Sequence, residues 1–174
     1  MGRLVITGSE GLIGKFLQKK LASYKIIPLD ISLGHDLTDE NFVESFFASH
    51  LDLDSLIVLH SFNPLPIAGS KNVKPEEISL SELQDYFNVN LFSVFDVCRK
   101  FIKYNKKGKI INVSSIYGEV SPKHTLYTNF TKHIGYSLSK SCIPMLSKYL
   151  ASYYPDVSIN TLILGGILKN ISRS

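Results

Sequence analysis

Short apolar runs that alternate with longer amphipathic segments limit the folds open to this chain more than any other feature of its sequence. The amphipathic segments predict helices at about residues 12–23, 39–50, 80–105 and 134–154. The apolar runs between them predict strands at Arg3–Thr7, Lys25–Asp30, Ser55–His60, Lys109–Ser114 and Val157–Leu164. Because strand and helix alternate throughout, we expect an α/β protein built on a doubly wound parallel sheet.

Composition and charge fit a single globular domain. The chain has 174 residues, of which 44% are hydrophobic and 20% are charged, so one domain covering residues 1–174 can bury a core. Residues 1–87 hold 7 Lys or Arg and 12 Asp or Glu, whereas residues 88–174 hold 12 and 3. We interpret the basic half as facing an anionic ligand or as lacking an acidic partner segment, and we expect no nucleic-acid partner.

The sequence carries no targeting or metal-binding signal. The opening apolar run, Leu4–Ile6, is too short for a signal peptide, and no run approaches the roughly 18 apolar residues of a membrane span. Cys98 and Cys142 are the only cysteines, too few for a metal cage or a disulfide framework. We therefore expect a cytoplasmic protein with no metal site and no contact with membranes.

A glycine-rich turn follows the first predicted strand and opens the first predicted helix. Glycines in such a turn allow a tight bend, a close approach of a pyrophosphate to the backbone, and close packing of helix on strand. The helix N-terminus adds free N–H groups and the positive end of its dipole. We predict that the turn binds a dinucleotide; an ordinary glycine-rich turn is the alternative. The predicted contacts are Gly8, Ser9, Glu10, Gly11, Leu12, Ile13 and Gly14.

Acidic residues near the end of the second predicted strand bear on the choice of cofactor. Asp30 lies where a carboxylate can accept hydrogen bonds from the adenosine ribose and repel a 2′-phosphate. Glu10 in the turn also disfavours a 2′-phosphate, so NAD(H) is predicted over NADP(H). Asp36 either caps the next helix or borders the adenine, together with Leu37.

Tyr136 and Lys140 have the spacing that says most about chemistry. Residues at i and i+4 share one helix face, so the Lys140 ammonium lies one turn from the Tyr136 phenol. A phenol has an ordinary pKa near 10 and needs a nearby cation to act as acid or base at neutral pH. Chance pairing of a Tyr with a Lys is the alternative.

Two further segments place polar groups near this pair. The strand that ends in Ser114 and Ser115 brings a hydroxyl to the same cleft, where it can donate to a substrate oxygen. Asn90 lies inside the long predicted helix. It either holds a water that relays protons to Lys140 or is a satisfied core amide.

In this combination and order, the motifs resemble the short-chain dehydrogenase/reductase family. The resemblance covers essentially the whole chain. The matching segments are Thr7–Gly14, Asp30, Asn88–Phe95, Ile110–Ser115 and the motif Tyr136-xxx-Lys140.

The resemblance implies a Rossmann-like fold and a set of site residues. The implied catalytic tetrad is Asn90, Ser115, Tyr136 and Lys140. Ser115 is preferred over Ser114 because the family's serine is usually the second of such a pair. The implied cofactor contacts beyond the glycine-rich turn are Asp30, Asp36, Leu37, Tyr136, Lys140, Gly166 and Ile167.

More narrowly, residues 115–166 resemble reductases of flagellin-glycan and surface-sugar modification. The long insert before Tyr136 and the sequence Tyr-Leu-Ala-Ser-Tyr-Tyr at 149–154 support this. The insert, residues 119–133, is the expected sugar-binding loop by its position, and a polar surface loop without function is the alternative. Its candidate residues are Lys123, His124, Tyr127, Asn129, Lys132 and His133.

The chain also departs from the family pattern. The glycine spacing is that of the extended, sugar-nucleotide branch. The helix and third strand that usually follow Asp30 are reduced to Ile31–His35, and His60-Ser61-Phe62-Asn63 replaces Asn-Asn-Ala-Gly beside the adenosine. His60 is interpreted as a packed strand-end residue without chemistry. Pro144 removes a helical hydrogen bond to the Lys140 carbonyl and predicts a kink.

The end of the sequence differs as well. Leu164 replaces the proline of the family's Pro-Gly pair, and the chain stops at Ser174. We therefore expect the last strand and the substrate-covering lid to be missing, which leaves a sheet edge for a partner to cover.

The sequence thus favours an NAD-dependent oxidoreductase that acts on a secondary alcohol or ketone, a small molecule of sugar type used in surface-glycan biosynthesis. The alternatives are a truncated, catalytically impaired nucleotide-binding or dimerising protein, and a sugar-nucleotide epimerase or dehydratase. In the family, the helix around Asn90 and the helix of Tyr136 form a dimer interface, so a homodimer or homotetramer is expected; core packing of both helices is the alternative.

Overall fold

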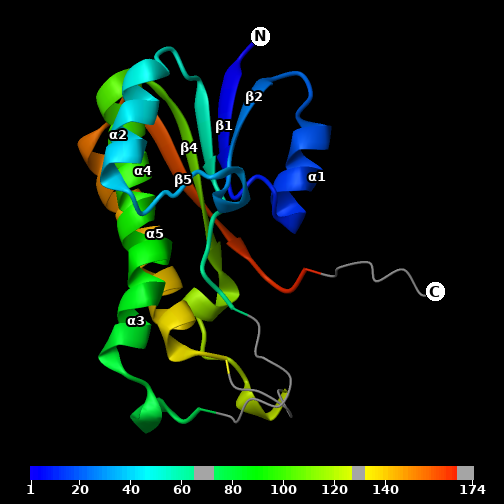
Figure 1. Cartoon of the computed structure of the whole chain (residues 1–174), viewed down its shortest axis with the longest axis vertical. Coiled ribbons are helices and arrows are strands. Elements are labelled where there is room, and N and C mark those ends of the chain that lie inside the picture. The colour runs from blue at the N-terminus through cyan, green and yellow to red at the C-terminus, as the bar shows by residue number, and fades with distance from the viewer. Residues whose placement is uncertain (65–72, 127–131, 168–174) are drawn as a thin grey trace, which may run out of the picture.

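Five parallel strands form one sheet in the computed structural model, which describes residues 1–64, 73–126 and 132–167. The spatial order is β2-β1-β3-β4-β5 (Figure 1). The predicted parallel α/β sheet is therefore confirmed, and strand ends differ from the prediction by two residues at most. The strands are β1 (Arg3–Thr7), β2 (Lys25–Leu29), β3 (Ser55–Val58), β4 (Gly108–Ser115) and β5 (Val157–Leu164).

Helices lie on both faces of the sheet. α1 covers one face, whereas α2, α4 and α5 cover the other (Figure 1). Side chains of β1 alternate accordingly: Leu4 and Ile6 pack with Leu17 of α1, and Val5 enters the larger core with Phe47 of α2. The α-helices are α1 (Leu12–Lys20), α2 (Glu40–Ser49), α3 (Leu80–Phe87), α4 (Ser93–Asn105) and α5 (Ile134–Tyr153).

The helix predicted for residues 80–105 has the predicted bounds, but it is not α-helical throughout. α3 ends at Phe87, and a π-helical turn over Asn88–Phe92 connects it to α4. A π-helical turn is wider than an α-helical one and is common at functional sites. Here it coincides with the complete burial of Asn90.

The edges of the sheet bear on two further predictions. Ile31–Leu33 form one 3₁₀ turn after β2, and no described residue forms a strand beyond β2, in agreement with the reduction predicted for Ile31–His35. Beyond β5, residues 165–167 have no regular structure and residues 168–174 lie outside the described part. The expected absence of a last strand and lid stays a prediction.

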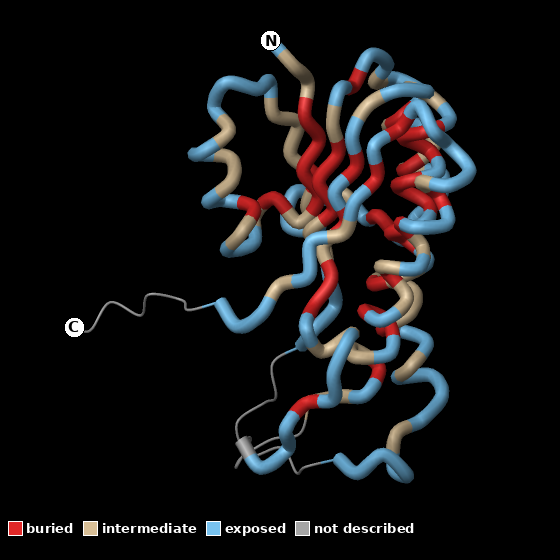
Figure 2. Tube along the Cα trace, turned by 180° about the vertical axis from the view of Figure 1, so that it is seen from behind, coloured by how far each residue is buried: buried red, intermediate tan, exposed pale blue. Residues whose placement is uncertain are grey.

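The topology places a crevice at one end of the sheet. From β1 the chain first forms β2 on one side and later β3 on the other, so a crevice opens at the carboxyl ends of β1 and β3, where ligands bind in such folds. Figure 2 shows buried residues gathered in the strands and on the helix faces turned to them, whereas the segments beyond this end are mostly exposed. Within the described ranges, no helix is long and apolar enough to cross a membrane.

Candidate active site

The glycine-rich turn after β1 has the geometry of a phosphate cradle. Gly8 has φ +64°, and a Cβ atom there would lie 2.7 Å from the backbone nitrogen of His60, so only glycine fits. A Cβ atom at Gly14 would lie 2.4 Å from the Ser9 carbonyl oxygen. α1 starts directly after Gly11 with no side-chain cap and no acidic residue in its first turn. Its N-terminal N–H groups therefore suit an anionic ligand.

Ser9 and Glu10 are anchored by the neighbouring strand β2. The Ser9 N–H donates to the Leu29 carbonyl (3.2 Å), and the Glu10 N–H donates to Asp30 Oδ2 (2.9 Å). The Ser9 hydroxyl is buried and has no hydrogen-bond partner among the described residues. A buried, unpaired hydroxyl at such a turn is consistent with a missing polar ligand.

The Asp30 carboxylate is fixed by three hydrogen bonds. Oδ2 accepts from Glu10, and Oδ1 accepts from the Ser32 N–H (2.9 Å) and the Ser32 hydroxyl (2.8 Å). Desolvation raises the pKa of Asp30, but these hydrogen bonds outweigh it, so the pKa lies below its ordinary value. Oδ2 keeps a lone pair for a ligand hydroxyl.

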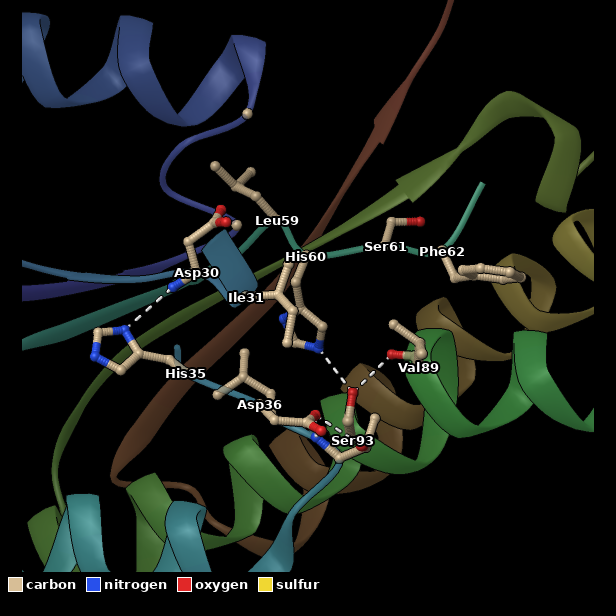
Figure 3. Close-up of a pocket in the computed structure, with 14 residues that line it drawn as sticks. Asp30, Ile31, His35, Asp36, Leu59, His60, Ser61, Phe62, Val89 and Ser93 are labelled. Carbon is tan, nitrogen blue, oxygen red and sulfur yellow. Dashed lines mark hydrogen bonds between the residues drawn. The ribbon is translucent and has the colours of Figure 1, made fainter. Parts of the chain in front are cut away.

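A cavity of about 370 Å³ opens beside Asp30 (Figure 3). Asp36 and Leu37 line it, and the described residues of its lining include no Lys or Arg. Asp36 Oδ1 accepts from the Thr38 N–H, whereas the N-cap of α2 is Asp39. The alternative that Asp36 caps the next helix is therefore wrong.

His60 links three elements at the floor of this cavity. Its Nδ1 lies 2.7 Å from Thr7 Oγ1, and its Nε2 lies 2.8 Å from Ser93 Oγ (Figure 3). Because the Ser93 hydroxyl donates to the Val89 carbonyl, it accepts from Nε2–H, and Thr7 then donates to Nδ1. Burial lowers the pKa of His60 to about 3, so the ring is neutral. The interpretation of His60 as a packed strand-end residue agrees with this network.

A second cavity, of about 480 Å³, contains three members of the predicted tetrad. It adjoins the first cavity at Leu59 and Ser61, which line both. Helix α5 supplies two of the catalytic candidates and the end of β4 supplies the third. The predicted site residues that line this cavity are Ile13, Ser115, Tyr136, Lys140, Gly166 and Ile167.

Lys140 is buried with its ammonium against the end of β4. Nζ donates to the Val113 carbonyl (3.1 Å), which leaves two of its three donor hydrogens for other partners. Burial lowers the pKa of Lys140 to about 8. The lysine is therefore close to its titration point at neutral pH, where a small change in surroundings alters its charge.

The two serines at the end of β4 have different partners. The Ser114 hydroxyl donates to the Lys140 carbonyl (2.8 Å), the group for which Pro144 provides no helical N–H. Ser115 Oγ accepts from the Tyr117 N–H (3.2 Å), so its own hydrogen stays available for a ligand. α5 is one continuous helix across Pro144.

Asn90 lies behind the catalytic cavity rather than in its lining. Its amide donates to the Phe62 carbonyl (3.0 Å) and to Ser139 Oγ (3.0 Å). Its oxygen accepts from the Phe62 N–H (2.6 Å) and the Ser61 hydroxyl (3.1 Å). The side chain therefore ties the segment after β3 to α5.

The sequence also matches a known family model. The model for short chain dehydrogenases aligns with residues 5–174. The chain belongs to the short-chain dehydrogenase family. The fold and family predictions are thereby confirmed, and membership makes the chain an oxidoreductase.

Curated relatives of this short-chain dehydrogenase include proteins of two kinds. Post-translational flagellin modification protein A of Campylobacter coli is 28% identical over 96% of this chain and 77% of its own length. Diacetyl reductase [(S)-acetoin forming] of Staphylococcus epidermidis strain ATCC 35984 is 32% identical over 74% of this chain. The match spans 59% of that enzyme's length.

Solved structures share the fold of this short-chain dehydrogenase. A short chain dehydrogenase from Leptospira borgpetersenii with bound NAD⁺ superposes with a TM-score of 0.81 at 24% identity, over 97% of this chain and 72% of its own. A small-chain dehydrogenase in complex with NADPH gives a TM-score of 0.74 at 19% identity, over 92% of this chain and 68% of its own.

Sequence reasoning missed the partners of several site residues. The hydrogen bond of Ser114 to Lys140 had a sequence signal, since Pro144 predicts an unpaired carbonyl four residues earlier. Lys132, one of the candidates named for the predicted sugar-binding loop, lines the catalytic cavity. Tyr127 and Asn129 of the predicted sugar-binding loop lie outside the described residues.

Proposed function

We propose that this short-chain dehydrogenase interconverts a secondary alcohol and a ketone with NAD(H) as hydride carrier. The observation that carries the proposal is one cavity lined by Ser115, Tyr136 and Lys140, which adjoins the cavity at the glycine-rich turn and Asp30. This arrangement allows a substrate oxygen beside the phenol and a dinucleotide along the strand ends.

In the reduction, each polar group acts on a particular atom. NADH, when bound, supplies the hydride that adds to the carbonyl carbon. The Ser115 hydroxyl donates a hydrogen bond to the carbonyl oxygen, and Tyr136 gives that oxygen its proton, so the products are an alcohol and NAD⁺. The Lys140 ammonium stabilises the negative charge that develops on the phenol oxygen and contacts the nicotinamide ribose. The relay role predicted for Asn90 requires its amide to exchange one present hydrogen bond for a water.

The chain offers a fitting surface for the whole dinucleotide. The turn holds the pyrophosphate through Gly8, Gly11 and the α1 N-terminus, because both glycines line the first cavity and the helix start has no side-chain cap. The free lone pair of Asp30 Oδ2 accepts from a ribose hydroxyl, and the Asp30 carboxylate repels a 2′-phosphate, while the nearby Lys15 is paired with Glu10 (3.3 Å). The proposed remaining contacts are Ser9, Glu10, Leu12, Ile13, Gly14, Asp36, Leu37, Gly166 and Ile167.

We also propose a sugar or sugar-derived substrate and a symmetric assembly. The relative named for flagellin modification supports the first, and the polar lining of the catalytic cavity is compatible with a hydroxylated substrate. Exposed apolar side chains on α4 and α5, such as Phe95 and Met145, support a homodimer or homotetramer.

Calorimetric titration of the chain with NADH and then NADPH tests the cofactor part of the proposal. Micromolar binding with NADH preferred is the expected result. Next, oxidation of NADH by a panel of ketones, including diacetyl and keto sugars, is followed by absorbance. Tyr136→Phe should lower turnover by roughly 10²–10⁴-fold while NADH still binds. A Tyr136→Phe variant with full turnover would overturn the assignment of the proton donor.

A further inference from the structure

Lys132 occupies the junction between the catalytic cavity and a third cavity. The third cavity has a volume of about 340 Å³ and lies between the turn that follows β4 and the first turns of α5. Lys132 and Tyr117 line both cavities. The Lys132 Nζ lies 5.6 Å from the centre of the Tyr136 ring, so its charge is next to the proposed proton donor.

The Lys132 charge has no acidic partner in the part of the chain that the structure describes. None of the ion pairs found there includes it, and its only recorded contact is the Tyr136 ring. Desolvation lowers the pKa of Lys132, and no carboxylate acts against that effect. A half-buried cation without a counter-charge is costly unless a ligand supplies the charge.

On the side of the catalytic cavity, the surroundings of Lys132 add positive rather than negative potential. The lining of the catalytic cavity includes Lys140 and contains no Asp or Glu among the described residues. α5 starts two residues after Lys132 and has no acidic residue in its first turn. Glu119 is the one carboxylate among the described residues that line the third cavity, and it makes no ion pair with Lys132.

We propose that Lys132 is a specificity residue that binds an anionic group, a carboxylate or a phosphate, on the ketone substrate. The inference rests on the proposed function, because it places the reacting carbonyl at Tyr136 and the rest of the substrate toward the third cavity. Apolar side chains there, Ile78, Val120 and Leu138, accommodate a carbon chain between the two groups. A lysine suits either anion because its ammonium acts as a point charge without a preferred fork geometry.

Two matched pairs of ketones test the proposal with NADH as the reductant. Levulinate carries a carboxylate where neutral 2,5-hexanedione carries an acetyl group, and dihydroxyacetone phosphate carries a phosphate that dihydroxyacetone lacks. We expect the wild-type chain to favour the anionic member of one pair by about tenfold in kcat/KM, as for one charge-assisted hydrogen bond. The pair that shows the preference distinguishes carboxylate from phosphate.

The variants separate a charge effect from a structural one. Lys132→Gln should remove the preference by raising KM for the anion about tenfold, while kcat/KM for the neutral ketone changes less than about twofold. Lys19→Gln, which removes an exposed lysine of α1 outside the cavity linings, should change neither value. Equal losses for both ketones, or no preference in the wild-type chain, would overturn the proposal.

A binding measurement keeps this test independent of the proposed reaction. Levulinate and dihydroxyacetone phosphate are titrated calorimetrically into the chain with NADH present. If none of the four ketones is reduced, the proposed function fails for these substrates, but binding of one anion that Lys132→Gln weakens about tenfold still supports the Lys132 site. If neither anion binds, or if Lys132→Gln leaves binding unchanged, the site is refuted.

Discussion

At the scale of single residues, Lys140 is the catalytic candidate whose ionisation the structure shifts strongly. Its ammonium is buried and has one backbone acceptor, the Val113 carbonyl, so burial lowers its pKa from 10.5 to about 8. The catalytic role proposed for Lys140 needs the charged form, which stabilises the negative charge that develops on the Tyr136 oxygen. The fold therefore sets an upper limit to the pH at which the pair works.

We predict that NADH-dependent ketone reduction loses activity as the pH rises through about 8. Above that value Lys140 becomes neutral and no longer stabilises the negative charge that develops on the Tyr136 oxygen, so kcat/KM should fall about tenfold per pH unit. Lys140→Arg keeps the charge, so in a folded variant the decline should be absent up to pH 10. If activity of the Lys140→Arg variant declined at the same pH as that of the wild-type chain, the decline could not be assigned to Lys140.

The loss of charge at Lys140 cannot cause this decline in activity by destabilising the folded protein. Between about pH 8 and 10.5 the unfolded chain binds a proton at this lysine that the folded chain does not. Stability rises with pH wherever the unfolded state binds more protons, so the contribution of Lys140 favours folding as its charge is lost. A melting temperature measured at each pH separates the two effects.

At the scale of elements, Ser114 and Pro144 together fix how β4 meets α5. Pro144 has no N–H, so the Lys140 carbonyl lacks its helical donor, and the Ser114 hydroxyl occupies that place at 2.8 Å. Gly118 packs against the same turn of α5, where a Cβ atom would lie 2.7 Å from the Lys140 carbonyl carbon. These contacts hold the Ser115 end of β4 beside the Tyr136 helix.

Ser114→Ala should lower the free energy of unfolding by about 1–3 kcal/mol, because it leaves a buried carbonyl without a donor. In the Pro144→Ala background the helix supplies the missing N–H, so the same substitution should cost less than about 1 kcal/mol. Urea unfolding of the wild-type chain, the two single variants and the double variant measures the coupling energy between Ser114 and Pro144. Ser115→Ala is the matched control and should show none with Pro144→Ala. Additive effects of Ser114→Ala and Pro144→Ala would refute the link.

The sequence predicted a helix or strand well where one repeating pattern of apolar residues determines it. The Tyr136-to-Lys140 spacing and the apolar runs predicted α5 and the strands closely. The sequence did not predict the π-helical turn at Asn88–Phe92, because one extra residue in a helical turn hardly changes the spacing of the apolar residues. The sequence also did not predict that Lys132 lines the catalytic cavity. A residue in the loop before a helix belongs to no repeating apolar pattern, and only tertiary packing brings it to the cavity.

At the scale of the whole molecule, the three adjoining cavities follow the carboxyl ends of the strands. The first lies at β1 and β2, the second at β4 and β5, and the third beyond the start of α5. His60 is central to this arrangement, because its ring connects Thr7 of β1 with Ser93 of α4. Any change that loosens the ring is therefore expected to affect the crevice and the global stability together.

His60 should make the stability of the whole protein sensitive to acid. Its pKa falls from 6.5 in the unfolded chain to about 3 in the folded chain, because burial disfavours the charged ring and the nearby Lys140 adds to this, against a smaller opposite effect of Asp30. Between these values the unfolded chain binds the extra proton, so stability is fully present above pH 6.5 and is lost toward pH 3. One proton corresponds to a slope of up to about 1.4 kcal/mol per pH unit.

Urea unfolding at steps between pH 7 and 5 measures that slope. His133 also has a pKa lowered by desolvation, so the wild-type slope contains more than one group. The difference between the wild-type chain and His60→Gln isolates the buried ring, and the variant, although less stable at pH 7, should lose less stability on acidification. His124→Gln removes an exposed histidine and is the matched control, expected to keep the wild-type slope. If His60→Gln also kept that slope, the ring would not be the neutral bridge between Thr7 and Ser93 that its hydrogen bonds describe.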